Sequence, residues 1–215
     1  IIFGGNMDKK KKLTMVLFWI LSFTWALPTT ILGVIVALGL RCAGYKPTRF
    51  GPCWCFEMDV NFGLELGLFF ISPKSKCYSL KCHELGHHLQ ACFLFGPLAL
   101  FVCFLPSAIR FWLRNMKTFK AKAVYCVVLT ILVFALGVVV SVIGGALSVW
   151  FVQKVGLAIR FYALAIGYWL LWLELPQYKE KPYPRYEDFK VEFDASARGT
   201  EFMQKYFPEY TSDLC

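Results

Sequence analysis

Charged side chains are scarce in this chain: only 17% of its 215 residues are Asp, Glu, Lys or Arg, whereas soluble domains carry about 25%. Apolar residues make up 58% of the chain, above the roughly 45–50% that is usual for a soluble domain. These two departures exclude an ordinary water-soluble domain and indicate that lipid is part of the solvent. The length fits one membrane bundle with a small water-exposed lobe.

Acidic residues are also few, with 14 Asp and Glu against 23 Lys and Arg, so the net charge is +9. Positively charged loops of this kind suit a membrane protein that faces anionic lipid headgroups. The chain lacks a basic stripe that alternates with aromatic residues, so we expect no binding to nucleic acid. The lipid bilayer is the first partner that the composition predicts.

The nine cysteines lack the spacing of a zinc knuckle, because Cys53 and Cys55 are separated by only one residue. An odd number of cysteines also leaves at least one without an intramolecular partner. We expect unpaired thiols in a reducing compartment, with a disulfide or a second metal site as the alternative.

Long apolar runs are what the chain does contain. The first covers residues 13–40 and follows a basic N-terminal segment, residues 1–12. Met7 is a candidate start, because the codons of Gly4 and Gly5 could read as a bacterial ribosome-binding sequence, and a genuine N-terminal extension is the alternative. The run is long enough to be transmembrane, but Pro28 should kink it, so it can also stay membrane-embedded without crossing. A cleavable signal peptide is disfavoured, because the run is too long and has no small-residue cleavage site.

Residues 123–175 predict a transmembrane helical hairpin whose two spans, 123–152 and 155–175, join at Gln153-Lys154. Arg160 is interpreted as a side chain that snorkels to the interface. A transporter or channel would require intramembrane charges that face a pore, and Arg160 is the one residue that qualifies.

The segment between the two membrane regions, residues 41–122, is expected to hold the functional core. Residues 41–62 look like a loop, and residues 64–71 predict one short strand. A helix is expected from about Ser79 to Phe95, where Gly96 and Pro97 end it. The apolar stretch 98–105 is too short to span a bilayer and is interpreted as re-entrant or interfacial.

The polar residues 176–215 form a soluble C-terminal lobe with a helix over residues 187–206. Together these segments predict a mainly all-α integral membrane protein with a short strand, a zincin-like helix pair and a membrane hairpin.

The chemistry lies in His83-Glu84-Leu85-Gly86-His87, an H-E-x-x-H motif. Residues four apart on a helix differ by roughly 40° in direction, so the two imidazoles can bind one Zn²⁺ ion. Glu84 then lies beside the metal, where it can act as general base toward a water molecule. All three histidines of the chain fall within six residues, which favours a site over a coincidence.

A third ligand is needed, and Glu192 is the candidate, since zinc hydrolases often use two histidines and a glutamate. Asp194 and Glu187 remain alternatives, and Glu192 can also be an ordinary solvated charge. Because His83, His87 and Glu192 must meet at one ion, an even number of crossings should separate them, and the hairpin supplies two.

The order of H-E-x-x-H, a two-helix membrane hairpin and E-x-x-A resembles the HtpX-type and CAAX-prenyl-protease-type membrane zinc peptidases, which are gluzincins. The resemblance implies that His83, His87 and Glu192 are the ligands and that Glu84 is the base. Ser196 stands where the group usually has an Asp that supports a ligand from behind.

The chain is also similar to small uncharacterised proteins of gut Firmicutes with an H-E-x-G-H motif. That similarity covers roughly residues 50–114 and 185–203, includes the pattern of Glu192, Ala195, Ser196 and Gly199, and implies that serine is a normal variant at position 196. It implies no substrate.

Several further polar residues are candidates for supporting or substrate-binding roles. Asp194 and Ser196 follow the third ligand, and Glu65 could line a substrate-binding strand, although a solvated residue is the alternative. His88 points away from the zinc face and is interpreted as a surface residue. Candidates for stabilising the oxyanion are Tyr183, Tyr186 and Arg198.

The sequence therefore predicts a zinc metalloendopeptidase of a bacterial cell membrane that hydrolyses peptide or membrane-protein substrates. The alternative is a non-catalytic membrane interaction protein that retains a zincin-like metal site. The lysines before residue 13 and one crossing would place the site outside the cell, but the basic loops 41–82 and 110–122 favour the cytoplasmic face, and a first segment that does not cross satisfies both.

Overall fold

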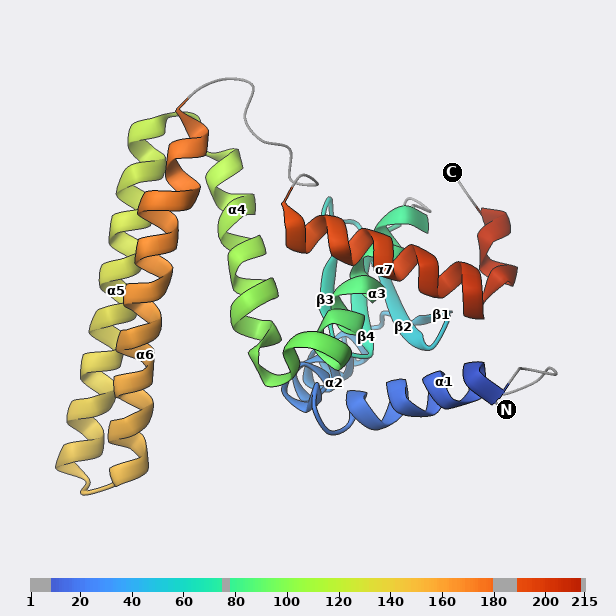
Figure 1. The fold of residues 1–215 in the computed structure, drawn as a ribbon, viewed down its shortest axis with the longest axis horizontal. Coiled ribbons are helices and arrows are strands. Elements are labelled where there is room, and N and C mark those ends of the chain that lie inside the picture. The colour runs from blue at the N-terminus through green and yellow to red at the C-terminus, as the bar shows by residue number, and fades with distance from the viewer. Residues whose placement is uncertain (1–8, 75–77, 180–188, 214–215) are drawn as a thin grey trace. The chain divides into compact units, whose positions relative to one another are not determined.

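A computed structural model describes the protein at residues 9–74, 78–179 and 189–213 (Figure 1). The chain divides into two compact units, one formed by Ile1–Ala108 with Glu187–Cys215 and the other by Ile109–Tyr186. Helices dominate both units, and a small sheet belongs to the first. The candidate start Met7 and the other residues before Lys9 lie outside the described residues.

The sheet of the first unit has four short strands in the order β1-β2-β4-β3. Their bounds are β1 Thr48–Phe50, β2 Cys53–Met58, β3 Leu64–Leu66 and β4 Phe69–Pro73. β2 and β4 are parallel, and the other two pairs are antiparallel. The prediction of a loop over residues 41–62 was wrong. Cys53 and Cys55 point into the core while Trp54 between them is exposed, but all three are apolar, so the alternation is invisible in the sequence.

The single strand expected over residues 64–71 is in fact the β3–β4 hairpin. Gly67 makes the turn with a φ of 68°, a left-handed conformation that favours glycine. Its amide donates to Glu65 Oε1 at 2.5 Å, so the Glu65 side chain closes the turn. In the sequence the reversal is hard to see, because Leu, Phe and Ile dominate the run on both sides of Gly67.

The first apolar run is broken into α1 (Lys9–Ser22) and α2 (Leu27–Cys42), which meet at an angle of 75°. The kink expected at Pro28 is confirmed, since this proline occupies the first turn of α2, where its missing amide costs no hydrogen bond.

The helix with the H-E-x-x-H motif is α3 (Tyr78–Gln90), and a π-helical turn continues it over Ala91–Phe95. Gly96 ends it with a φ of 53°, as the sequence predicted. A short 3-10 turn and a second π-helical turn then lead into α4 (Leu105–Asn115).

The last long helix, α7 (Lys190–Tyr206), packs closely on α3. Two glycines make this approach possible. A Cβ atom on Gly86 of α3 would overlap the carbonyl of Ala195, and one on Gly199 of α7 would overlap the carbonyl of Cys82. Buried Leu85 and Met203 belong to the same apolar core. The contact fixes the two helices that carry the predicted ligands.

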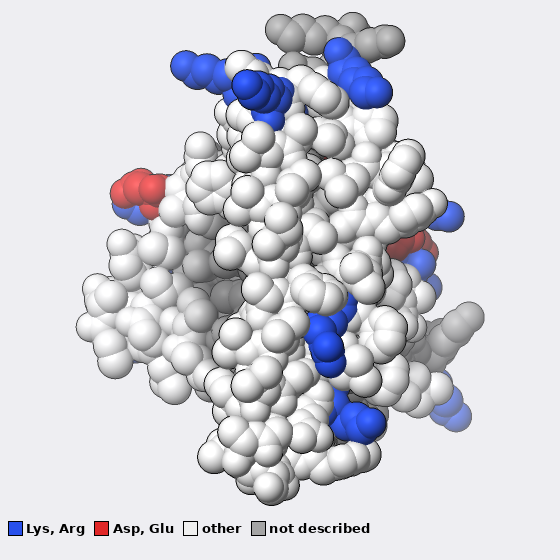
Figure 2. All heavy atoms as spheres, turned by 90° about the vertical axis from the view of Figure 1, so that its left-hand side faces the viewer, with Lys and Arg blue, Asp and Glu red and all other residues white. Residues whose placement is uncertain are grey.

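The second unit contains the helical hairpin of α5 (Phe119–Ala146) and α6 (Trp150–Tyr168), the latter extended by a π-helical turn over Trp169–Glu174. Both helices are long and apolar enough to cross a membrane. Uncharged side chains cover most of the face shown in Figure 2, as lipid contact requires. The connection lies at Leu147–Val149 rather than at Gln153-Lys154, because Ser148 adopts a positive φ of 53° there.

Close contact between α5 and α6 depends on small residues, as expected. A Cβ atom on Gly137 would lie 2.8 Å from the carbonyl oxygen of Gly156, and one on Gly144 would lie 2.6 Å from the amide of Gln153. Such small surfaces let two spanning helices approach through their backbones.

The second unit also holds a buried acid that the sequence interpretation overlooked. Glu174 is fully buried, and its carboxylate accepts from Arg110 Nε at 3.2 Å and from the Tyr178 hydroxyl at 3.1 Å. Because Glu174 lies within the predicted span 155–175, Arg160 is not the one charged residue there. The Arg160 side chain places Nη2 3.4 Å from Ser141 Oγ. The Arg110–Glu174 pair instead fastens α4 to the end of α6.

Candidate metal centre

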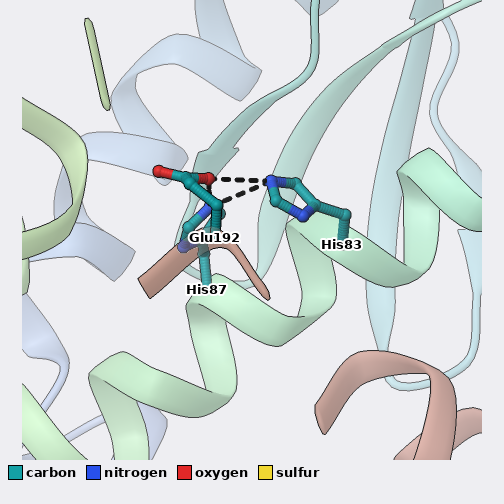
Figure 3. Close-up of side chains that lie close together, drawn as sticks. All are labelled: His83, His87 and Glu192. Atoms are coloured by element: carbon teal, nitrogen blue, oxygen red, sulfur yellow. Dashed lines mark hydrogen bonds and ion pairs between the residues drawn. The ribbon is translucent and has the colours of Figure 1, made fainter. Parts of the chain in front are cut away.

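Three donor atoms converge between α3 and α7 in the first unit (Figure 3). Glu192 Oε2 lies 3.2 Å from His83 Nε2 and 3.1 Å from His87 Nε2, and the two Nε2 atoms are 3.1 Å apart. Glu192 is fully buried in the first turn of α7, whereas 15% of the His83 side chain stays exposed. The three predicted ligands therefore lie together, in a site that keeps some access to solvent.

The donor spacing fits a single metal ion. Ligand bonds of about 2.0–2.2 Å in a tetrahedral zinc site place the donor atoms about 3.3 Å from one another. The observed separations of 3.1–3.2 Å are close to this value. Two imidazole nitrogens and one carboxylate oxygen leave a fourth position open, as in hydrolytic sites. The group can thus hold a metal without rearrangement.

The protonation of His87 is set by Gln90, one turn further along α3. The Gln90 amide nitrogen donates to Val191 O at 2.8 Å and to Asp194 Oδ2 at 2.9 Å. Its oxygen must then face His87 Nδ1, 3.0 Å away, which makes that nitrogen the donor. In the neutral ring, Nε2 consequently has its lone pair free for a metal.

His83 and Glu192 also make hydrogen bonds through the side-chain atoms that do not face the donor group. His83 Nδ1 shares a 2.8 Å hydrogen bond with Ser196 Oγ, which orients the imidazole. The Ser107 hydroxyl, in the first turn of α4, donates to the second oxygen of the Glu192 carboxylate. Each of the three donors thus has a fixed orientation, which is what a metal site needs.

The charge of Glu192 is favoured by its neighbours. Burial alone would raise the pKa of this carboxyl, but its contacts with the imidazoles of His83 and His87 and the hydrogen bond from Ser107 hold it well below its usual range. An ionised carboxylate is the form that binds a metal.

Glu84 lies next to the donor group and is only 5% exposed. Burial raises the pKa of its carboxyl to about 7, against the opposing effect of His87 and His83. Gly63 covers the carboxylate so closely that a Cβ atom there would overlap Glu84 Oε1. A carboxyl with a pKa near neutrality can both accept and return a proton.

The other candidates occupy different places. Asp194, the alternative ligand, faces Gln90 and pairs with Arg198 Nε at 2.6 Å, so the described residues bring Glu192 rather than Asp194 to the histidines. This pairing occupies the one oxyanion candidate that is described, Arg198. Glu187, Tyr183 and Tyr186 lie outside the described residues.

The surface position expected for His88 is wrong, and Glu65 is not the solvated residue that was one of its two interpretations. His88 is fully buried on the opposite face of α3, 2.9 Å from Ser22 Oγ and 3.3 Å from Glu65 Oε1. Only 11% of the Glu65 side chain is exposed. The two residues tie α1, α3 and β3 together, so their role among the described contacts is structural.

Gln90 and Ser107 are the supporting residues that the sequence interpretation missed. Gln90 carried a usable signal, since it is a polar residue three positions after His87 in a run that is otherwise apolar. Ser107 carried none, because a serine after a proline is common at any helix start.

Comparison of the chain with family models, with curated proteins and with solved structures finds no match.

Replacing Gln90 by leucine should lower the affinity for zinc by about 10- to 100-fold, since supporting partners of metal ligands contribute on that scale. The amide no longer fixes the tautomer of His87 or the start of α7. Competition with a zinc-binding dye measures the effect. Gln177→Leu, at an exposed position of the second unit, is the control, and equal affinities for both variants would contradict the role of Gln90.

Proposed function

We propose that this protein is a zinc-dependent metallopeptidase that cleaves peptide bonds of membrane or membrane-proximal substrates. The observation that carries the proposal is the convergence of His83, His87 and Glu192 within 3.2 Å of one another, with buried Glu84 beside them. Two nitrogen donors and one oxygen donor suit zinc among the common metals.

The chain's own residues account for the proton movements of hydrolysis. Bound zinc would act as a Lewis acid and lower the pKa of a coordinated water toward about 7. Glu84 takes a proton from the attacking water, whose oxygen bonds to the peptide carbonyl carbon. When the C–N bond breaks, Glu84 returns that proton to the leaving nitrogen. Gln90 and Ser196 keep the two imidazoles oriented throughout.

The hairpin of the second unit indicates where the site lies with respect to a membrane, and so which substrates can reach it. The hairpin of α5 and α6 is long and apolar enough to anchor the chain in a bilayer. Because the hairpin separates α3 from α7 in the sequence, its two ends and both ligand helices belong to the same side. Lys117, Lys120 and Lys122 flank the start of α5, and Lys154 follows the turn. Positive charge is thus in excess at the open end of the hairpin compared with its turn, which favours a cytoplasmic location for the open end and the metal site of a bacterial membrane protein.

The resemblance to HtpX-type and CAAX-prenyl-protease-type peptidases supports the same activity. Ser196 in place of the aspartate of that group is compatible with it, since the serine makes a hydrogen bond to the ligand His83. A non-catalytic interaction protein that keeps the metal site is the alternative, and it predicts bound zinc without turnover.

Metal analysis tests the site directly. We expect the protein purified from membranes to carry about one zinc per chain and Glu192→Ala to lose most of it, because two imidazoles alone hold zinc poorly. Elemental analysis by mass spectrometry gives the ratio. Glu201→Ala, at an exposed position of the same helix, is the control. A wild-type protein without any bound divalent metal would end the proposal.

A further inference from the structure

Two bends of the chain meet within the first unit. One lies between α1 and α2, which form an angle of 75°, and the other follows α3, where Tyr78–Leu98 and Leu100–Asn115 form an angle of 105°. Ala26 from the first bend packs in one buried cluster with Ala91, Cys92 and Ala99 from the second. Gly96 lies so close to the indole of Trp25 that no Cβ atom would fit between them.

The first bend leaves neither arm long enough to cross a membrane. The apolar part of α1 covers 10 residues and α2 covers 16, which at 1.5 Å per residue gives roughly 15 Å and 24 Å. The hydrocarbon core of a bilayer is about 30 Å thick. Neither arm can therefore cross the core alone, and the 75° bend keeps residues 13–40 from forming one straight span.

Polar backbone groups at the first bend have partners, as a lipid environment demands. The hydroxyl of Thr30 donates to Ser22 O at 2.8 Å, and that of Thr29 donates to Ala26 O at 2.9 Å. The amide of Ala26 donates to Leu21 O at 2.8 Å. A bend exposed to water would not need these side chains, because water would satisfy the same groups.

Large apolar side chains around both bends are exposed. Among them are Phe23 at 54%, Trp25 at 50%, Phe93 at 42%, Leu94 at 46% and Leu98 at 60%. In water an exposed group of this size would be unfavourable. We call these five residues the bend surface.

Positive charge flanks the first bend on both sides. Between Lys12 and Arg41 the sequence has no charged residue, and both of these side chains are exposed. Basic residues at each end of an apolar segment anchor it at lipid headgroups, with anionic ones preferred. Two anchored ends with a bent middle fit a segment whose ends lie at the same interface.

We propose that residues 13–40 form a re-entrant membrane anchor, which enters an anionic bilayer and returns to the side from which it entered. The bend surface is the part of the first unit that inserts into the hydrocarbon. The metal-site unit then has its own contact with lipid, in addition to the hairpin of α5 and α6. Its consequence is that Lys12 and Arg41 lie on one side of the membrane. The proposal is independent of the metal and of catalysis.

Protease accessibility tests the topology. Recognition sites for a sequence-specific protease are inserted singly before Lys9, after Gly44 and, as control, at Ser148 in the hairpin turn, and each variant is expressed in bacterial spheroplasts. We expect external protease to cut only the site at Ser148, and all three after permeabilisation. Cleavage of the sites before Lys9 and after Gly44 from opposite sides would overturn the proposal. If external protease cuts both of these sites and spares Ser148, the anchor is supported and the cytoplasmic assignment falls.

Photo-crosslinking in native membranes tests what covers the bend surface. We expect Leu98→p-benzoylphenylalanine and Phe93→p-benzoylphenylalanine to give adducts with the mass of one phospholipid. The same substitution at Glu201, exposed on α7, should give none and serves as the control. Adducts of two copies of this chain, or of the chain with another protein, would overturn lipid as the occupant.

Discussion

A Glu84→Gln variant is expected to keep its zinc and to hydrolyse peptides at least about 100-fold more slowly, which is the lower end of what a positioned general base contributes. The amide has the shape of the carboxyl group and leaves the three donors of the metal site untouched. It cannot accept a proton from water, so the step that precedes attack on the carbonyl is lost. A quenched fluorescent peptide library in detergent measures turnover, and elemental analysis measures the metal.

Glu201→Gln makes the matched control, since Glu201 is exposed on α7 and far along that helix from Glu192. It should equal the wild type in both assays. Bound zinc together with equal turnover by wild type and Glu84→Gln would contradict the role of Glu84. Bound zinc without any turnover in the wild type would favour the non-catalytic alternative.

Gly86→Ala should have the second large effect, the loss of the metal site through a single methyl group. That methyl would overlap the backbone carbonyl of Ala195, and a backbone cannot move aside as a side chain can. The helices α3 and α7 must then separate, which carries Glu192 away from the imidazoles. We expect zinc binding to fall sharply and the free energy of unfolding to fall by about 1–3 kcal/mol, as for other overpacked cores.

Gly39→Ala provides the control for this experiment. Gly39 lies within α2 and has nothing within 4 Å of its missing Cβ atom, so alanine should be neutral or slightly stabilising there. Thermal unfolding in detergent and zinc titration report on both variants. If Gly86→Ala binds zinc as the wild type does, the close contact of α3 and α7 is not what holds Glu192 in place.

The metal site could be predicted from the sequence because its geometry is local or nearly so. His83 and His87 are four residues apart, and helical periodicity alone aligns them. Glu192 was reached through spacing and family resemblance rather than through geometry, and its place beside the histidines is confirmed. The identity of the metal and the reaction stay predictions.

The sheet was not predictable in the same way. Its strands have only three to six residues, which is too short for a clear alternation, and at the start of β2 exposed Trp54 is as apolar as the buried cysteines on either side of it. The contacts of Gln90 with Asp194 and of Arg110 with Glu174 join residues more than 60 positions apart. No local pattern encodes such pairs, whereas the kink at Pro28 and the two long helices of the hairpin follow from local rules and are confirmed.

The separation of the ligands along the chain has a consequence for biosynthesis. His87 and Glu192 are 105 positions apart, and both helices of the hairpin lie between them. A ribosome therefore finishes α5 and α6 before it makes the carboxylate that completes the site. Until then a nascent chain carries only two of the three donors, so the complete His83–His87–Glu192 group forms only after both of these long apolar helices have been synthesised.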